Sequence, residues 1–199
     1  MVKTLLCPGS RIAEIGVFEG TFSDVLLSTK PSRLWLIDPW DGISCSGDAD
    51  GNNVKSVNLE TVYYQLLQKY HDNPNVKLVR GRSPWALSSL ETWFDNCPTP
   101  SDGWVDAVYI DGDHSYEGCL ADLLTAERYV RAGGWIMGHD YSMNMSKAKN
   151  HYEFGVKQAV DEFCERRKLK LSAVAMDGCM SYAIKVPEVG GLPVPGWGC

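Results

Sequence analysis

The sequence has no apolar run of membrane-spanning length, and residues 1–8 contain too short an apolar stretch for a secretory leader. It has no run of basic residues, and its net charge of −6 argues against sequence-independent binding to nucleic acid or anionic membranes. The 7 cysteines include no C-x-x-C pair, which favours reduced thiols over a disulfide framework. These absences predict a cytoplasmic protein that binds neither membranes nor nucleic acid.

Internal repeats are absent as well, and 199 residues suit one domain with a full hydrophobic core. We expect a single domain over 1–199, with its core in about 11–186 and an irregular tail rich in Gly and Pro over 187–199. Segment 41–57 is polar and rich in Gly, Asp and Asn, which predicts a long binding loop or lid.

Short apolar runs alternate with helical patterns along most of the chain. Strands are expected near 12–17, 33–38, 76–80, 106–111 and 135–138, and a hairpin over 169–175 and 181–186. Helices are expected to begin near 21, 58, 83, 115 and 155. This order predicts an α/β fold, a doubly wound and mostly parallel sheet with helices on both faces and an antiparallel C-terminal hairpin strand.

The first strand ends in the pattern E-x-G-x-x-x-G, formed by Glu14, Gly16 and Gly20, directly before a helix that starts at Thr21. A strand, a glycine turn and a helix in this order present backbone N–H groups to a ligand. A dinucleotide fingerprint has glycine where Glu14 stands. A carboxylate there would repel a pyrophosphate, but it suits a ligand with an ammonium and a sulfonium, such as S-adenosylmethionine. An ordinary strand-to-helix turn is the alternative.

Two further strand ends carry polar residues suited to a nucleoside. Asp38 ends the second strand, where an acid is placed to bind ribose hydroxyls, although it could also cap the turn formed with Pro39. Ser83 follows the third strand and is expected to cap a helix whose first residue is Pro84. The same position would place Ser83 at the edge of an adenine.

With these motifs in order, the chain resembles the class I S-adenosylmethionine-dependent methyltransferases, and a small bacterial-type branch most of all. The resemblance covers about 11–186, and the catechol-type O-methyltransferases are similar in outline. The matching motifs are E-I-G-V-F-E-G (14–20), D-P-W (38–40), R-G-R-S (80–83), Y-I-D-G-D-H-S-Y-E (109–117), G-G with H-D-Y (133–141), and G-V-K with A-V and F (155–163).

The resemblance implies a Rossmann-like sheet of seven strands, the last antiparallel, and a cofactor site at the strand tips. Glu14, Gly16 and Gly20 would hold the methionine end of S-adenosylmethionine, and Asp38 its ribose. The remaining residues that it assigns to cofactor binding are Trp40, Arg82, Ser83, Asp111 and Asp113. Of these, Trp40 could stack on the adenine or serve only as an apolar anchor of its loop.

Asp111 and Asp140 end adjacent strands in this fold, so their carboxylates would point into one crevice. Two acids this close need a cation, a shared proton or a cationic ligand. A divalent metal, Mg²⁺ by preference for oxygen ligands, is one solution. The catechol-type relatives carry Asn after the second acid, and Tyr141 stands there in this chain, which removes one oxygen ligand.

His114 follows Asp111 at the place where the catechol-type relatives carry a lysine base. Its imidazole could take a proton from an acceptor hydroxyl, with Asp111 as its catalytic neighbour, or it could only cap the next helix or bond Asp113 or the cofactor. His139 is expected to have a structural role or to support the residues that contact the ligand.

These features together predict a methyltransferase that acts on a hydroxyl of a small molecule, a sugar or a natural product. An NAD-dependent oxidoreductase, or a non-catalytic domain that binds S-adenosylmethionine or a nucleotide, is the alternative. Larger relatives carry helices before the first strand that cover the acceptor site. We therefore expect an open site, or one completed by a homo-oligomer.

Overall fold

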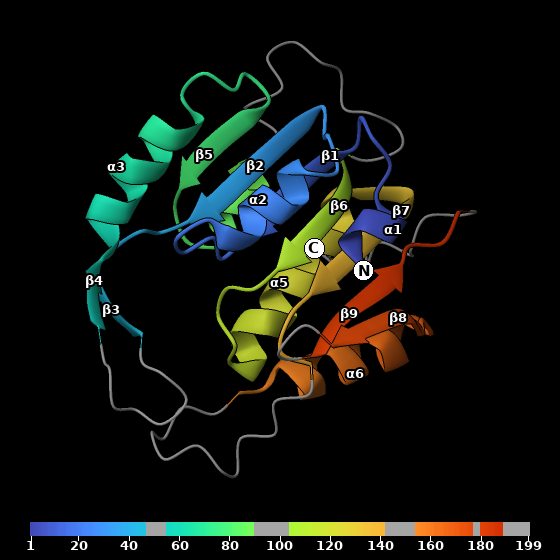
Figure 1. Cartoon of the computed structure of the whole chain (residues 1–199). Coiled ribbons are helices and arrows are strands. Elements are labelled where there is room, and N and C mark those ends of the chain that lie inside the picture. The colour runs from blue at the N-terminus through green and yellow to red at the C-terminus, as the bar shows by residue number, and fades with distance from the viewer. Residues whose placement is uncertain (47–54, 90–103, 142–153, 177–179, 189–199) are drawn as a thin grey trace, which may run out of the picture.

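The computed structural model describes residues 1–46, 55–89, 104–141, 154–176 and 180–188 (Figure 1). A seven-stranded sheet forms its centre. Counted across the sheet in space, the first five strands are parallel to one another. The C-terminal hairpin then adds an antiparallel partner for the fifth. This confirms the predicted sheet. In spatial order the strands are β5 (Val76–Arg80), β2 (Arg33–Asp38), β1 (Arg11–Ile15), β6 (Val105–Ile110), β7 (Val130–Gly138), β9 (Met180–Lys185) and β8 (Leu171–Met176).

Helices cover both faces of the sheet, as predicted, and each face has its own apolar cluster. No helix in the described ranges has the length and apolar character needed to cross a bilayer. One face carries α1 (Val2–Leu5), α2 (Thr21–Leu27) and α3 (Leu59–Tyr70), and the other carries α4 (Trp85–Ser88), α5 (Tyr116–Tyr129) and α6 (Val156–Arg167).

The two clusters explain why the central strands read as continuous apolar runs. Along β1, Ile12 packs into the cluster under α2 and Ala13 into the cluster under α5. On neighbouring β6, Tyr109 and Val108 divide between the two clusters in the same way. Strands buried on both faces alternate between two interiors, so no polar face interrupts the pattern.

Three local features differ from the sequence-based expectation. Segment 41–57 is not a plain loop, because β3 (Ile43–Ser46) and β4 (Lys55–Asn58) pair antiparallel within it, while 47–54 lies outside the described residues. Helix α1 was not predicted, because four residues carry no readable period. The strand expected near 135–138 begins earlier, because α5 ends at Tyr129 and Gly133 and Gly134 already lie within β7.

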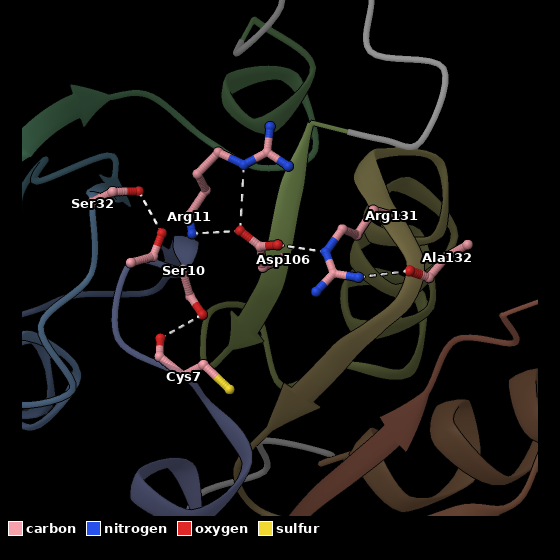
Figure 2. Close-up of polar contacts among 8 residues, drawn as sticks. Cys7, Ser10, Arg11, Ser32, Asp106, Arg131 and Ala132 are labelled. Atoms are coloured by element: carbon pink, nitrogen blue, oxygen red, sulfur yellow. Dashed lines mark hydrogen bonds and ion pairs between the residues drawn. The ribbon is translucent and has the colours of Figure 1, made fainter.

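Asp106 ties three strands together at the amino end of the sheet, away from the strand tips discussed below (Figure 2). Its Oδ2 accepts the backbone N–H of Arg11 at 2.6 Å and the Nε–H of the same residue at 3.3 Å. Its Oδ1 accepts the Nε–H of Arg131 on β7. Burial alone would raise the pKa of this carboxyl, but the hydrogen bonds from the two arginines lower it below 3.8.

We expect Asp106→Asn to lower the free energy of unfolding by about 1–3 kcal/mol, because two charged hydrogen-bond partners lose their carboxylate. A group whose pKa falls on folding stabilises the protein above its unfolded pKa, near 4, and that contribution disappears as the pH falls through the folded value. The stability difference between wild type and variant, measured in urea, should therefore shrink below about pH 4. Asp72→Asn, at an exposed carboxylate, is the control. Equal stability of Asp106→Asn and wild type at pH 7 would contradict this assignment.

Candidate functional site

The tips of β1, β6 and β7 meet at the carboxyl edge of the sheet. The backbone N–H of Asp111 donates to the carbonyl of Ile15 at 2.8 Å, and that of His139 donates to the carbonyl of Ile110 at 3.1 Å. These bonds continue the strand ladder beyond the last paired residues. The turns after three neighbouring strands therefore lie beside one another, which is where open α/β sheets bind ligands.

Gly16 makes the close approach of two of these turns possible. Its φ is +81°, and a Cβ at this position would lie 1.9 Å from the carbonyl oxygen of Asp111 and 2.7 Å from the Cα of Gly112. Gly20 begins α2 with φ +74°, and a Cβ there would meet the side chain of Leu66 at 2.7 Å. Gly16 is thus required by the packing of backbone against backbone, and Gly20 by its left-handed conformation and its packing against Leu66.

Asp38 holds the turn after β1 from the side of β2. Its Oδ2 accepts the N–H of Val17 at 3.0 Å and that of Phe18 at 3.1 Å, and its Oδ1 accepts the N–H of Trp40 at 2.7 Å. The carboxylate therefore shapes both turns, in agreement with the capping alternative. A carboxylate oxygen has two lone pairs, so Oδ1 can still accept a ribose hydroxyl, and that role stays a prediction.

Trp40 lies inside the protein and not on the surface of the crevice. Its side chain is fully buried, its Nε1–H donates to the carbonyl of Phe18 at 3.0 Å, and its ring lies 5.2 Å from that of Tyr63. This is the geometry of an apolar anchor. Stacking on an adenine would require the turn to open, and it stays an untested prediction.

Glu14 is a buried acid on β1, one residue before the strand ends. It is 1% exposed, and its Oε2 accepts the hydroxyl of buried Ser23 at 2.6 Å. Burial, opposed by that hydrogen bond and reinforced by the charges of Asp111, Asp38 and Asp24, raises the pKa of Glu14 to about 8. The site therefore holds a carboxyl that a neighbouring cation would ionise.

Ser83 and Arg82 lie at the tip of β5, but their side chains go in different directions. Arg82 is exposed and pairs with Asp41 at 2.8 Å. The prediction that Ser83 caps a helix beginning at Pro84 is wrong, because α4 starts one residue later and has no side-chain cap. The Ser83 hydroxyl instead donates to buried Asp122 at 3.0 Å, a partner on α5 that the sequence did not reveal.

The structure brings His114 together with both predicted acids. Its Nε2 lies 3.1 Å from Oδ1 of Asp111 and 3.1 Å from Oδ2 of Asp140. Burial alone would lower the pKa of His114, but the two carboxylates raise it to about 9. His114 therefore carries a proton near neutral pH in the free protein and neutralises the acidic pair. Its role as a base stays a prediction.

Asp140 and its neighbour His139 complete this cluster. Asp140 is 8% exposed, and although burial opposes ionisation, hydrogen bonds with His114 and His139 hold its pKa well below the usual range. Nδ1 of His139 lies 3.3 Å from Asp140 and 3.9 Å from Asp111. His139, expected to have a structural or a supporting role, is thus part of the cluster, and its place beside Asp140 at a strand end was the available signal.

Asp111, His139 and Asp140 each offer one ligand atom, and these three atoms lie within 4.8 Å of one another. Two carboxylates and an imidazole suit a divalent transition metal as well as Mg²⁺. Tyr141 contributes nothing to this group, since its hydroxyl donates to Asp161 on α6 at 2.6 Å. Segment 142–153, which follows it, lies outside the described residues.

Asp113 lies on the exposed side of the same turn. Its Oδ1 accepts the backbone N–H of Ser115 at 2.9 Å, and the Ser115 hydroxyl in turn caps α5 by accepting the N–H of Gly118. The side chain therefore shapes the start of α5. Its assignment to cofactor binding stays a prediction.

The chain matches the family described as methyltransferase domain over residues 13–141. The uncharacterized protein R132 of Acanthamoeba polyphaga mimivirus is 30% identical over 129 residues, which cover 64% of this chain and 50% of the viral protein. The chain thus spans about half the length of the curated relative that it matches.

Solved structures share the fold at low identity. An O-methyltransferase from Bacillus cereus in complex with SAH has a TM-score of 0.55 and 17% identity, covering 92% of this chain and 76% of that one. Fibrillarin of Aeropyrum pernix with natively bound S-adenosyl-L-methionine has a TM-score of 0.58 and 14% identity, with coverage of 89% and 67%. An rRNA methylase from Streptococcus thermophilus has a TM-score of 0.55 and 11% identity, with coverage of 94% and 92%. At these identities the shared feature is the fold.

Proposed function

The chain belongs to the methyltransferase domain family and is a class I methyltransferase. On this premise we propose that it transfers the methyl group of S-adenosylmethionine to a hydroxyl of a small molecule, such as a sugar or a natural product. The observation that carries the proposal is the group of acids at the carboxyl edge of the sheet, beside the Gly16 turn. Glu14, Asp111 and Asp140 lie at the tips of adjacent strands, where they would attract a cationic methyl donor. A pyrophosphate, as in NAD, would be repelled there.

Each part of the cofactor has a place at this edge. The glycine turn would receive the methionine end beside Glu14, and Asp38 would accept a ribose hydroxyl through Oδ1. Ser83 at the tip of β5 would face the adenine. Strand tips and turns that are built into the sheet supply all of these groups, so the site is largely formed before the ligand arrives.

The buried position of Glu14 gives this proposal a measurable consequence. With a pKa of about 8, Glu14 is mostly protonated in the free protein at pH 7. A nearby sulfonium or ammonium favours the carboxylate, so binding should release a proton. The affinity should then rise with pH by up to about tenfold per unit and level off above pH 8.

Calorimetry at pH 7 in two buffers of different ionisation enthalpy measures the released proton directly. Glu14→Gln should remove this release and weaken S-adenosylmethionine by about tenfold at pH 8.5, because one nearby charge is lost. Glu60→Gln on the exposed side of α3 is the control. The same proton release in Glu14→Gln as in wild type would rule Glu14 out as the responsible group.

Methyl transfer needs few chemical groups from the protein. The acceptor oxygen attacks the methyl carbon in line with the sulfur, the sulfur–carbon bond breaks, and neutral S-adenosylhomocysteine leaves. Holding the two reactants in this alignment can supply about 7–11 kcal/mol of the rate enhancement. The hydroxyl proton must go to a base. Asp111 is one candidate, and His114 is the other once it has lost the proton that its pKa of about 9 gives it in the free protein.

A divalent metal fits the residues that are present. Asp111, His139 and Asp140 would hold it, and a bound cation would lower the pKa of an acceptor hydroxyl and orient it. The protein's own contribution is to position these ligands. Asp111 and Asp140 follow adjacent paired strands, and His114 contacts both carboxylates from the start of α5.

The experiment begins with calorimetric titration of S-adenosylmethionine and S-adenosylhomocysteine. Formation of S-adenosylhomocysteine is then followed over a panel of sugars, phenols and ribosomal RNA, with and without EDTA. We expect binding of both ligands, and turnover with a hydroxylated small molecule that EDTA abolishes and added metal restores. Absence of binding at millimolar ligand would overturn the proposal. Turnover on RNA alone would replace the acceptor class, against the net charge of −6.

A further inference from the structure

Asp122 is a buried acid that no step described so far uses. It lies on α5, is 1% exposed, and accepts the hydroxyl of Ser83 on Oδ2 at 3.0 Å. Its Oδ1 is buried and has no hydrogen-bond partner within the described part of the chain. Burying a carboxylate with a single hydroxyl partner lowers the stability of the fold, which suggests that Asp122 has a role other than stabilisation.

The bond between these residues lies at the carboxyl edge of the sheet, beside the turn after β6 and the end of β1. A Cβ on Gly112 would come within 3.7 Å of the Asp122 Oδ2, within 3.9 Å of the Ser83 Oγ and within 3.1 Å of the Ile15 side chain. Ser83 follows β5, Gly112 follows β6 and Ile15 ends β1, so the hydroxyl lies where the tips of these strands converge. If the proposed function holds, this is the base end of the nucleoside site.

The direction of the hydrogen bond decides what Ser83 can offer a ligand. A serine hydroxyl has one proton and two lone pairs. Ionised Asp122 has no proton to give, so Ser83 must donate its own, and only its acceptor lone pairs remain for the crevice. Arg82, beside it, carries donors alone and is paired with Asp41. Ser83 is therefore the side-chain acceptor at this tip.

We propose that Asp122 is a positioning residue that fixes the Ser83 hydroxyl as an acceptor for the exocyclic amine of adenine, and that the pair selects a 6-amino purine over a 6-oxo purine. The inference rests on the proposed function and adds a specificity device to it. A 6-oxo group would bring an acceptor against an acceptor. A site built around one buried hydrogen-bonding group discriminates strongly against the analogue that leaves it unpaired.

The ionisation of Asp122 sets the conditions of the test. Burial raises its pKa to about 6, the Ser83 hydrogen bond opposes the shift, and the charge of Asp113 adds to it. At pH 8 the carboxylate is ionised and can only accept. The measurement is therefore made at pH 8, by calorimetric titration of S-adenosylhomocysteine and of its 6-oxo analogue S-inosylhomocysteine.

Wild type should bind S-adenosylhomocysteine at least about tenfold more tightly than the 6-oxo analogue. Asp122→Asn keeps the shape, but its amide can donate to Ser83 or accept from it, so the hydroxyl can turn either way. In Asp122→Asn the preference for S-adenosylhomocysteine over the 6-oxo analogue, expressed as the ratio of the two affinities, should fall to about threefold or less. Ser83→Ala should reduce this ratio similarly. Glu117→Gln, an exposed carboxylate on the same helix, should keep the wild-type ratio.

A structural role and a positioning role give different results. If Asp122→Asn weakens both ligands equally and the ratio stays at the wild-type value, Asp122 only ties α5 to the β5 tip and the inference is wrong. Should Asp122→Asn not fold, Ser83→Ala decides by the same ratio. If wild type binds neither ligand, the proposed function fails, and this inference with it.

Discussion

Gly16→Ala is expected to lower the free energy of unfolding by about 3 kcal/mol or more and to abolish cofactor binding. The added Cβ would lie 1.9 Å from the Asp111 carbonyl oxygen and 2.4 Å from its carbon. Both are backbone atoms at the end of β6, so no side-chain rotation relieves the overlap. The tip of β6 must move away from β1, and it takes Asp111 and His114 with it.

A variant at Gly9 serves as the control, because it carries the cost of a side chain in a left-handed backbone without the steric overlap found at Gly16. Its φ of +86° is close to the +81° of Gly16, but a Cβ there would meet nothing within 4 Å. Gly9→Ala should therefore cost only about 1–2 kcal/mol and leave binding intact. Urea denaturation and titration with S-adenosylhomocysteine measure both effects. Equal losses of stability in the two variants, with binding retained in Gly16→Ala, would show that the close approach is not needed.

The sequence was enough to predict the sheet because its signals are local. The apolar runs of β1 and β2 end at Gly16 and Asp38, and both residues lie where the glycine turn and the strand-end acid place them. Asn58 caps α3 by accepting the N–H of Thr61, as its position before the helical pattern predicted. The patterns that predicted these features lie within a few positions in the chain, although Gly16 and Asp38 make their contacts in the fold with more distant residues.

The polar contacts of the site depend on distant neighbours, and the sequence predicted them less well. The capping role expected for Ser83 failed because a buried carboxylate 39 positions away accepts its hydroxyl. The position of His139 beside Asp140 was a local signal, but its approach to Asp111 depends on the pairing of β6 with β7, which no local pattern shows. The strands β3 and β4 are short and polar, so no hydrophobic period marked them.

Asp140→Asn is expected to weaken divalent-metal binding and methyl transfer by about 100-fold or more, while S-adenosylhomocysteine affinity changes by less than about threefold. Asp140 contacts both histidines of the cluster, His114 and His139. Its Oδ2 faces His114 at 3.1 Å and its Oδ1 faces His139 at 3.3 Å. An amide in this place removes a charged ligand and gives His114 a weaker acceptor, so Asp111 alone is left to balance a cation.

Titration with Mn²⁺, followed by electron paramagnetic resonance, measures the loss of metal affinity without requiring a known methyl acceptor. Asp161→Asn removes the same charge from the exposed carboxylate that accepts the Tyr141 hydroxyl, next to the cluster but outside its ligand group. It should bind Mn²⁺ as wild type does, since water and salt screen the charge of an exposed carboxylate that does not contact the metal. Wild-type Mn²⁺ affinity in Asp140→Asn would remove the metal from the proposal and leave the carboxylates to be balanced by the histidines beside them. If both variants lose Mn²⁺ equally, the ion is held by the general negative potential of this edge and not by the three assigned ligands.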